Sequence, residues 1–320
     1  MHTRTSVRLL TAAFVAAAVV LAGCGSDSSS NDSSSSSGNG KGWDSTEVSG
    51  AVGSGVTVKF NGEVTDSTQS TKVLEEGDGE TVEQGDSLIL QTVIADGTTQ
   101  KTVASSYNDH QPQVVTLSSQ VTKIFLDALS GKTIGSRVAV YAPAETVFGP
   151  SGNPQLGVSQ KDPVMLVFDL LGKPLNGPDG KRHAAPSWFP KIGRTKGTIS
   201  GLDFKGTPEP NGKLRSAALY DGTGPVVKKG QTIFVRYLGQ VYGGKKPFDE
   251  NFSGADPVSF QIGAGKVIKG WDKTLVGQHV GSEVVVAIPP ADGYGKQGNS
   301  QAGIKGTDTL YFVVDILGAA

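Results

Sequence analysis

The residue types that most often carry covalent or metal chemistry are scarce in this chain. Its single cysteine, Cys24, excludes an internal disulfide and a thiolate-rich metal site. The four histidines stand far apart in the sequence, and no pair has the spacing typical of metal ligands: His2, His110, His183 and His279. We therefore expect no metal site.

Glycine-rich stretches that could cradle phosphate groups also fail on closer reading. The segment GAGK at 263–266 has the wrong glycine spacing for a phosphate-binding loop, and Val267 follows it where Ser or Thr is needed. The turns at 77–79 and 222–224 lack the third glycine of a dinucleotide-binding motif, and no alternation of strands and helices surrounds them. The sequence thus predicts no cofactor.

Length and charge bound the class of protein. A chain of 320 residues is long enough for two domains of ordinary size. It has 29 basic and 30 acidic side chains, a net charge of −1. This balance gives no electrostatic reason to expect nucleic acid or an anionic membrane surface as a partner.

The N-terminus has the pattern of an export signal, residues 1–24. Arg4 and Arg8 precede an apolar run at 9–21, which is shorter than the roughly 20 residues that span a bilayer as a helix. The run ends in Leu-Ala-Gly-Cys24, which resembles the processing box of bacterial lipoproteins. That resemblance implies acylation of Cys24 and anchoring to the outer face of the cell membrane; the alternative is an ordinary secretory signal with an incidental cysteine.

The segment 25–44 that follows is expected to be a flexible tether. Its residues 25–41 are mostly Ser, Gly and Asn and offer almost nothing that could be buried. A flexible coil of these 17 residues would hold the folded part roughly 20–25 Å from the membrane.

The remaining sequence contains an internal repeat, in which Gly135 and Gly281 align at an offset of 146 residues. We therefore expect a first domain at 45–173, a linker at 174–196 and a second domain at 197–320. The stretches that match are Ser54-Gly55-VTVKF with Ser200-Gly201-LDFKG, 72–86 with 216–231, 126–143 with 272–289, and 165–172 with 312–318.

The hydrophobic periods of the second domain are mostly those of strands. Alternating or β-branched apolar runs predict strands at 232–237, 257–262, 283–288 and 309–317. One helical stripe lies between them, formed by Val267, Ile268, Trp271 and Leu275 and ended by Gly277. The first domain repeats this stripe with Val121, Ile124, Phe125 and Leu129. Antiparallel strands with one covering helix predict an α+β fold in both domains.

An ordered series of short motifs in the second domain resembles the FKBP family of peptidyl-prolyl cis-trans isomerases, from Tyr220 to Leu317. The series is GQTIFVRYLG, KPFDENF, PVSFQIGAGKVIKGWDKTL, AIPPADGYG and TLYFVVDIL. The resemblance implies two tandem FKBP-like domains, each a twisted antiparallel β-sheet wrapped around one short α-helix, with an apolar cleft between sheet and helix in the second.

The same resemblance assigns site residues in the second domain. Its implied catalytic residues are Tyr237, Asp249, Ile268 and Tyr294, and its implied substrate-binding residues are Phe248, Val258, Phe260, Val267, Trp271, Ile304 and Phe312. Asn299 stands where a histidine is common in the family, so loop contacts are expected to differ. The plain alternative is that the apolar members are ordinary core residues.

The chemistry that such residues could perform is rotation about an Xaa-Pro amide bond. This rotation needs no nucleophile or metal, and its uncatalysed barrier is about 18–20 kcal/mol. An apolar aromatic pocket disfavours the charge-separated planar amide, and donors to the flanking carbonyls can hold the chain while the bond turns. We expect an isomerase that assists folding of exported proteins, or else a non-catalytic, chaperone-like lipoprotein that binds Pro-containing segments. By resemblance only, macrolide immunosuppressants could occupy the cleft.

The first domain lacks the corresponding polar residues. Tyr237 aligns with Thr92, and the pair Phe248-Asp249 falls near Thr102-Val103. The remaining counterparts are Phe125 for Trp271, Phe148 for Tyr294 and Leu166 for Phe312. We therefore expect the first domain to keep the scaffold with little isomerase activity.

Overall fold

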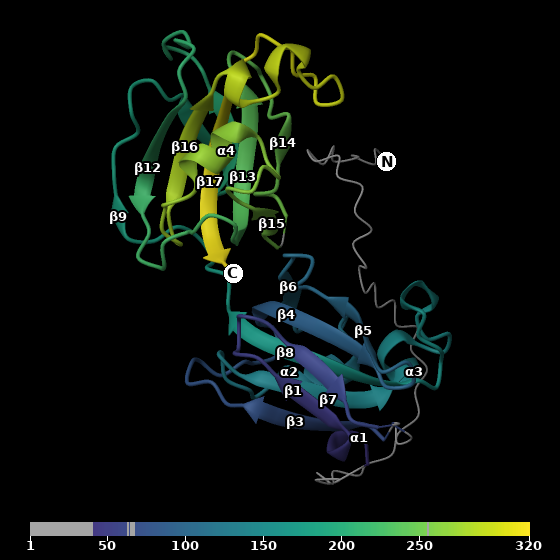
Figure 1. Cartoon of the computed structure of the whole chain (residues 1–320). Coiled ribbons are helices and arrows are strands. Elements are labelled where there is room, and N and C mark those ends of the chain that lie inside the picture. Colours follow the sequence, from purple (N-terminus) through teal and green to yellow (C-terminus); the bar gives the residue numbers. More distant parts are fainter. Residues whose placement is uncertain (1–40, 63, 65–67, 255) are drawn as a thin grey trace. The chain divides into compact units, whose positions relative to one another are not determined.

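The computed structural model describes residues 41–62, 64, 68–254 and 256–320 (Figure 1). The expected signal peptide, Cys24 and residues 25–40 of the expected tether lie outside this part of the chain. The described residues divide into two compact units, 41–173 and 174–320, called here the N-terminal and the C-terminal domain. No helix among them is long and apolar enough to cross a membrane.

The C-terminal domain is built on a twisted antiparallel sheet with the strand order β14-β13-β17-β16-β12-β9, and β15 pairs with β13 (Figure 1). Its strands are β9 (Lys181–Arg182), β10 (Lys191–Thr195), β11 (Thr198–Asp203), β12 (Arg215–Asp221), β13 (Thr232–Val241), β14 (Asp249–Glu250), β15 (Val258–Gln261), β16 (Glu283–Ile288) and β17 (Leu310–Ala319). Its helices are α4 (Lys269–Thr274) and the 3-10 turns η2 (Pro290–Asp292) and η3 (Gly295–Gln297).

The N-terminal domain repeats this topology in the order β5-β4-β8-β7-β3, with β6 paired to β4. Its elements are α1 (Lys41–Asp44), β1 (Thr46–Ser49), β2 (Thr57–Phe60), β3 (Ser70–Glu75), β4 (Ser87–Asp96), β5 (Lys101–Ser105), β6 (Gln113–Thr116), α2 (Lys123–Leu129), β7 (Arg137–Pro143), α3 (Ala144–Phe148), η1 (Pro154–Leu156) and β8 (Pro163–Gly172). The registers agree as well, since Val140 faces Leu166 in one sheet and Val286 faces Phe312 in the other. The expected α+β fold is confirmed.

The central strands are held by burial on both faces of each sheet. Every residue of β16 is buried, and its run of valines matches the β-branched side chains that pack best in a pleated strand. One face of the C-terminal sheet packs against α4 through Val284, Val286 and Val314. The other face carries Val285 and Val313, which pack under the hairpin β10–β11.

The helix α4 is shorter than the apolar stripe suggested. Val267 and Ile268 precede it, and Ile268 is its N-cap residue in an extended conformation (φ −60°, ψ 144°). Leu275 is the C-cap, so Trp271 is the one stripe residue inside the helix. Gly270 lets the helix lie close to the sheet, because a Cβ at this position would stand 2.6 Å from Ile288 Cδ1.

The segment expected as a linker, 174–196, groups with the C-terminal domain. Its strand β9 pairs with β12, and β10 forms a hairpin with β11. Phe189 is buried under the sheet with a relative exposure of 6%. This part of the chain is therefore folded onto the second domain rather than spanning between two.

Candidate functional site

The centre of the candidate site is a hydrogen bond between two neighbouring strands. Tyr237 lies on β13 and Asp249 on β14, and the tyrosine hydroxyl donates to Asp249 Oδ2. The register places Asp249 opposite Gly239, which brings its carboxylate to the level of the tyrosine. Burial, together with the neighbouring Asp249 carboxylate, raises the pKa of Tyr237 above its ordinary value. The hydroxyl is therefore a permanent donor at neutral pH.

Asn251 fixes the two strands in this register. Its Oδ1 accepts from the backbone N–H of Tyr237 at 2.7 Å, and its Nδ2 donates to the Val235 carbonyl at 3.1 Å. The backbone N–H of Asn251 also donates to the Tyr237 carbonyl at 3.0 Å. The side chain thus completes the ladder where β14 ends, and it holds Asp249 against Tyr237.

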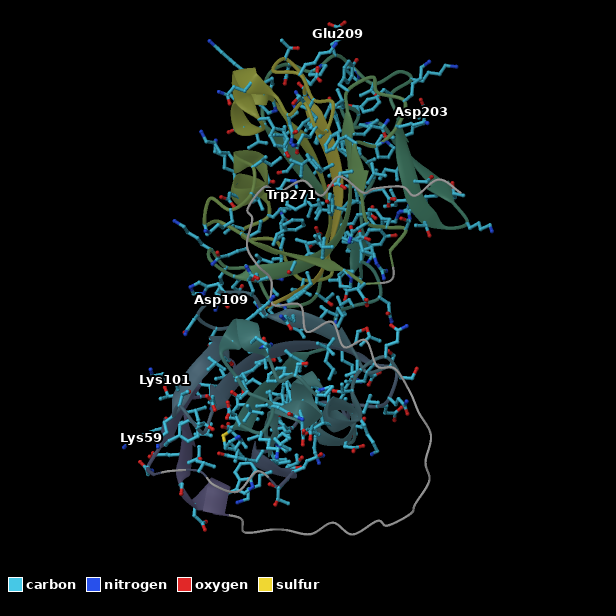
Figure 2. All side chains as sticks on the ribbon, turned by 90° about the vertical axis from the view of Figure 1, so that its right-hand side faces the viewer. Lys59, Lys101, Asp109, Asp203, Glu209 and Trp271 are labelled. Atoms are coloured by element: carbon cyan, nitrogen blue, oxygen red, sulfur yellow. The ribbon has the colours of Figure 1, made fainter. Side chains whose placement is uncertain are left out.

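Aromatic rings surround the hydrogen bond in edge-to-face contacts. Trp271 stands at the centre, with ring centroids 5.4 Å from Tyr237, 5.1 Å from Phe260 and 5.4 Å from Phe312. Phe248 extends the series by contacting Phe312 at 5.6 Å. The planes of these pairs meet at 79–88°, the arrangement that the ring quadrupoles favour. Figure 2 shows Trp271 in the interior, whereas charged side chains such as Asp203 point outward.

Two N–H donors at the site have no internal acceptor. Trp271 is 4% exposed, and its indole Nε1 has no hydrogen-bond partner among the described residues. The amide of Ile268 precedes the first turn of α4, where helix geometry leaves N–H groups unsatisfied, and it donates to none of the described residues. The Ile268 amide is available to a bound peptide, whereas the indole Nε1 is buried.

The loop after Tyr294 closes the same side of the domain. Burial raises the pKa of Tyr294 to about 12, and the charge of Asp249 acts in the same direction. Ile304 is 4% exposed and packs with the aromatic cluster. It also forms a bridge with Asn299, in which each backbone N–H donates to the other carbonyl at 2.8 Å.

The structure therefore brings most of the predicted residues together. Tyr237, Trp271, Ile304 and Phe312 are buried in one cluster, and Phe248, Phe260, Val267, Ile268 and Tyr294 pack against it half-buried. Asp249 joins through the tyrosine hydroxyl. Val258 is the exception: it lies on β15 outside this cluster and is 36% exposed.

Sequence reasoning missed Gly239 and Asn251. A Cβ at Gly239 would lie 2.6 Å from both Phe248 Cζ and Phe312 Cε1, so this glycine allows the two rings to meet over the strand. A glycine inside a strand pattern is a signal of close approach, and this one was available in the sequence. Asn251 gave no such signal because its partners are backbone groups.

Comparisons with known proteins agree with this geometry. The family model described as FKBP-type peptidyl-prolyl cis-trans isomerase matches residues 224–317. The chain is 37% identical over 116 residues to an FK506-binding protein of Streptomyces anulatus, and it covers 93% of that protein. The chain belongs to the FKBP family. A second relative, FK506-binding protein 2 of Dictyostelium discoideum, is 37% identical over 112 residues, which are 83% of its length.

Longer FKBP relatives are matched over a small part of their length. FK506-binding protein 4 of Aspergillus oryzae is 40% identical over 124 residues, but these are 24% of that protein. Among solved structures, FkpA from Escherichia coli is 33% identical, with a TM-score of 0.30, over 33% of this chain and 47% of FkpA.

The N-terminal domain places different side chains at the positions of the FKBP site. Register equates Tyr237 with Thr92, since they face Val314 and Phe168 on the matching strands. The counterpart of Asp249 is Ala104, one residue beyond the expected Val103, because a bulge in β5 shifts the pairing. The carboxylate of Asp249, the phenol groups of Tyr237 and Tyr294 and the indole of Trp271 thus have no counterpart at the matching positions of the N-terminal domain.

Proposed function

We propose that the C-terminal domain catalyses cis-trans isomerisation of Xaa-Pro peptide bonds in exported polypeptides. The observation that carries this proposal is the partly buried Tyr237–Asp249 hydrogen bond beside Trp271. It places a polar group next to an apolar, aromatic surface. Membership of the FKBP family supports the same activity, because the family is that of peptidyl-prolyl isomerases.

The proposed mechanism is stabilisation of the twisted amide. The planar amide owes its stability to charge separation between nitrogen and oxygen, and this is weakened in apolar surroundings such as the rings around Trp271. The free amide of Ile268 and the hydroxyl of Tyr294 can hold the carbonyls on either side of the proline. Each tenfold of acceleration requires about 1.4 kcal/mol of preferential binding to the twisted form. Asp249 orients the Tyr237 hydroxyl and abstracts no proton.

An exchange measurement on a proline peptide tests the activity directly. Full-length protein should increase the cis-trans exchange rate of an Ala-Leu-Pro-Phe-type peptide in NMR exchange spectra, and Asp249→Ala should lower that increase. Arg215→Gln serves as the control, because Arg215 lies beside Trp188 on the opposite face of the sheet. An exchange rate equal to that of the peptide alone would leave only the binding function.

Binding without turnover is the second candidate, and the N-terminal domain favours it. Phe125 there replaces the tryptophan and packs on Phe168 at 5.3 Å, and half-buried Val115 and Phe148 line the same core. Such an apolar surface could hold Pro-containing segments in a chaperone-like manner. Equal affinity of one peptide for the wild type and for the Asp249→Ala variant, measured by NMR line broadening, would support a binding contribution that is independent of catalysis.

We propose further that the protein is anchored by lipid at Cys24 on the outer face of the bacterial cell membrane. The support is the signal pattern in residues 1–24 and its small residues before the cysteine. A Cys24→Ala variant should fail to incorporate labelled palmitate and should leave the membrane fraction. Labelling that survives this substitution would refute the assignment.

Macrolide binding is proposed for the same aromatic site. Relatives of this chain are named FK506-binding proteins, and FK506 should therefore compete with proline peptides. Unchanged peptide exchange at saturating FK506 would exclude a shared site.

A further inference from the structure

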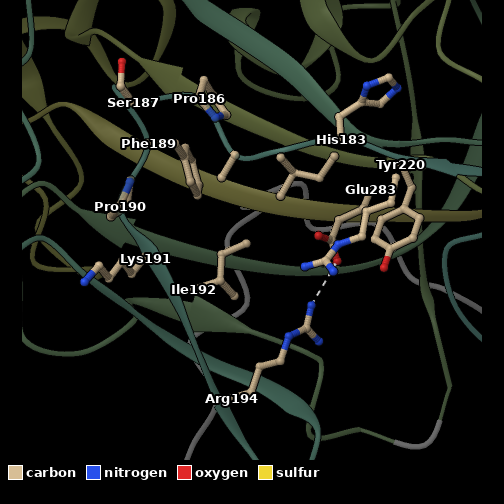
Figure 3. Close-up of a pocket in the computed structure, with 13 residues that line it drawn as sticks. His183, Pro186, Ser187, Phe189, Pro190, Lys191, Ile192, Arg194, Tyr220 and Glu283 are labelled. Carbon is tan, nitrogen blue, oxygen red and sulfur yellow. Dashed lines mark hydrogen bonds and ion pairs between the residues drawn. The ribbon is translucent and has the colours of Figure 1, made fainter.

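A cavity of about 440 Å³ lies on the face of the C-terminal sheet opposite the aromatic site. The residue alternation of β16 separates the two faces: Val284 and Val286 face α4, whereas Glu283 and Val285 face the hairpin β10–β11. The cavity is lined mainly by the chain before that hairpin (Figure 3): Arg182, His183, Ala185, Pro186, Ser187, Phe189, Pro190, Lys191, Ile192, Arg194, Leu219, Tyr220 and Glu283. Its size falls within the range of pockets that hold small ligands.

Arg194 and Glu283 meet at one end of this cavity, whereas Lys191 stands apart from them beside Pro190 (Figure 3). Glu283 is 2% exposed, and its Oε2 lies 3.4 Å from Nη2 of Arg194. Arg194 also donates from Nη1 to the Gly197 carbonyl at 3.2 Å, and its side chain remains 47% exposed. A guanidinium has five N–H donors, so Arg194 keeps donors for a third partner. Arg182 stands close enough for its charge to act on Glu283.

The lining of the cavity carries excess positive charge. Arg182, Lys191 and Arg194 are opposed by one acid, Glu283, and His183 already pairs with Asp221 at 2.5 Å. Burial raises the pKa of Glu283, and burial beside Glu283 raises the pKa of its cross-strand neighbour Asp315 to about 8. Burial therefore disfavours the charged form of both carboxyls, and they neutralise less of the arginine charge than two exposed acids would.

Another part of the cavity lining is apolar. Pro186, Phe189 and Pro190 come from the segment before β10, Ile192 comes from β10 itself, and Leu219 comes from the sheet. Phe189 is 6% exposed and Ile192 is half-buried. Such a wall suits an aromatic hydrocarbon ring, because aromatic rings attract one another in offset-stacked or edge-to-face contacts, here with Phe189.

We propose that this cavity binds a small organic anion, an aromatic carboxylate whose ring lies on the Pro186–Phe189 wall and whose charge meets Arg194 and Arg182. A carboxylate accepts two parallel hydrogen bonds from one guanidinium, which gives the site its geometry as well as its affinity. The site is separate from the isomerase site and does not depend on that activity.

Titration of the full chain with naphthalene-2-carboxylate tests this proposal by NMR chemical shifts and calorimetry. Saturable binding is expected, weakened at least tenfold in Arg194→Gln and in Arg182→Gln. Arg215→Gln is the matched control: it removes the same charge from the same face of the sheet, yet Arg215 does not line the cavity. Its affinity should equal that of the wild type.

Two further probes separate the charge from the ring. Naphthalene-2-carboxamide lacks the charge and inorganic phosphate lacks the ring, so both should bind at least tenfold more weakly than the carboxylate. Phosphate that binds as tightly as the carboxylate would overturn the proposal, because the apolar wall would then contribute nothing. So would the absence of saturable binding, or equal weakening in Arg215→Gln.

Discussion

The two domains share one topology but fill the face beneath the helix with different chemistry. In the C-terminal domain, Gly239 leaves room for two phenylalanine rings, and Tyr237 reaches Asp249. In the N-terminal domain, Ile94 stands at the glycine position, and a threonine stands at the tyrosine. Both sheets nevertheless keep the same register. The fold therefore does not require the residues of the candidate site, because the N-terminal domain adopts the same topology without them.

The two sheets also differ on the face that is covered by a hairpin, at one pair of matching positions. In the N-terminal sheet, Arg137 on β7 faces Asp169 on β8, and Nε lies 2.6 Å from Oδ1. In the C-terminal sheet, Glu283 faces Asp315 at the same register, and the arginine comes from the covering hairpin as Arg194. In both domains an arginine joins hairpin to sheet. The arginine belongs to the sheet in the N-terminal domain and to the hairpin in the C-terminal domain. The C-terminal sheet therefore has two neighbouring acids, Glu283 and Asp315.

The largest expected effect is on the stability of the N-terminal domain. Arg137 also donates to the hairpin carbonyls of Gly50 and Gly55, so Arg137→Met should leave Asp169 buried without its cation. Breaking a buried ion pair from one side costs about 3–5 kcal/mol. Hydrogen exchange of β7 and β8 should show this loss, while β16 and β17 should keep their protection.

Lys123→Met is the control for that substitution. Lys123 pairs with Asp127 at 2.6 Å, but both side chains are largely exposed, and such pairs contribute less than about 1 kcal/mol. Equal losses in the two variants would mean that the buried pair does not hold the hairpin to the sheet.

The sequence predicted both sheets because apolar, β-branched runs such as 283–288 are typical of buried strands. The internal repeat supported the same strands in the N-terminal domain. The sequence pattern predicted too long a helix. Val267 and Ile268 belong to the apolar stripe, but they lie in the segment that leads into the helix, where Ile268 is extended. The segment 174–196 was expected as a linker because its own sequence has no strand pattern. Its strand β9 exists through pairing with β12, which follows more than 30 residues later.

The grouping of most predicted site residues in one cluster was foreseeable, because each motif that contributes to it is an unbroken stretch of sequence. Gly239 was foreseeable too, but its role depends on two rings that meet over the strand. The pair Glu283–Asp315 was not, since only the cross-strand register joins two acids so far apart in sequence.

The next effect concerns the Tyr237–Asp249 hydrogen bond, which the N-terminal domain lacks. Asp249→Ala, which installs the residue found at Ala104, should lower kcat/KM for a proline peptide roughly 10–150-fold, because a hydrogen bond to a charged group is worth about 1.5–3 kcal/mol. Tyr237→Phe removes the same bond from its other end and should give a similar loss. The double variant should lose little more than either single one. Losses that add in full would show that the two residues act separately.

A smaller effect is expected from the glycine beneath the rings. In Gly239→Ala the new Cβ would stand 2.6 Å from Phe248 and Phe312, and overpacking of this kind costs about 1–3 kcal/mol. Exchange assays should show roughly tenfold slower isomerisation. Gly177→Ala is the matched control, since nothing lies within 4 Å of a Cβ there. If both variants kept full activity, the close approach at Gly239 would have no functional role.

A further prediction, whose effect is small over any single pH unit, is a pH dependence in the C-terminal domain. Asp315 is 5% exposed, and burial together with the Glu283 charge raises its pKa to about 8, despite the opposing charges of Arg194 and Arg236. Between about pH 4 and pH 8 the folded domain therefore holds a proton that the unfolded chain has released. Its free energy of unfolding should fall as pH rises through this window, by at most about 1.4 kcal/mol per pH unit. Asp315→Asn should flatten this slope in hydrogen-exchange measurements on β16 and β17, with β7 and β8 as the internal reference. A slope that survives the substitution would locate the proton elsewhere in the domain.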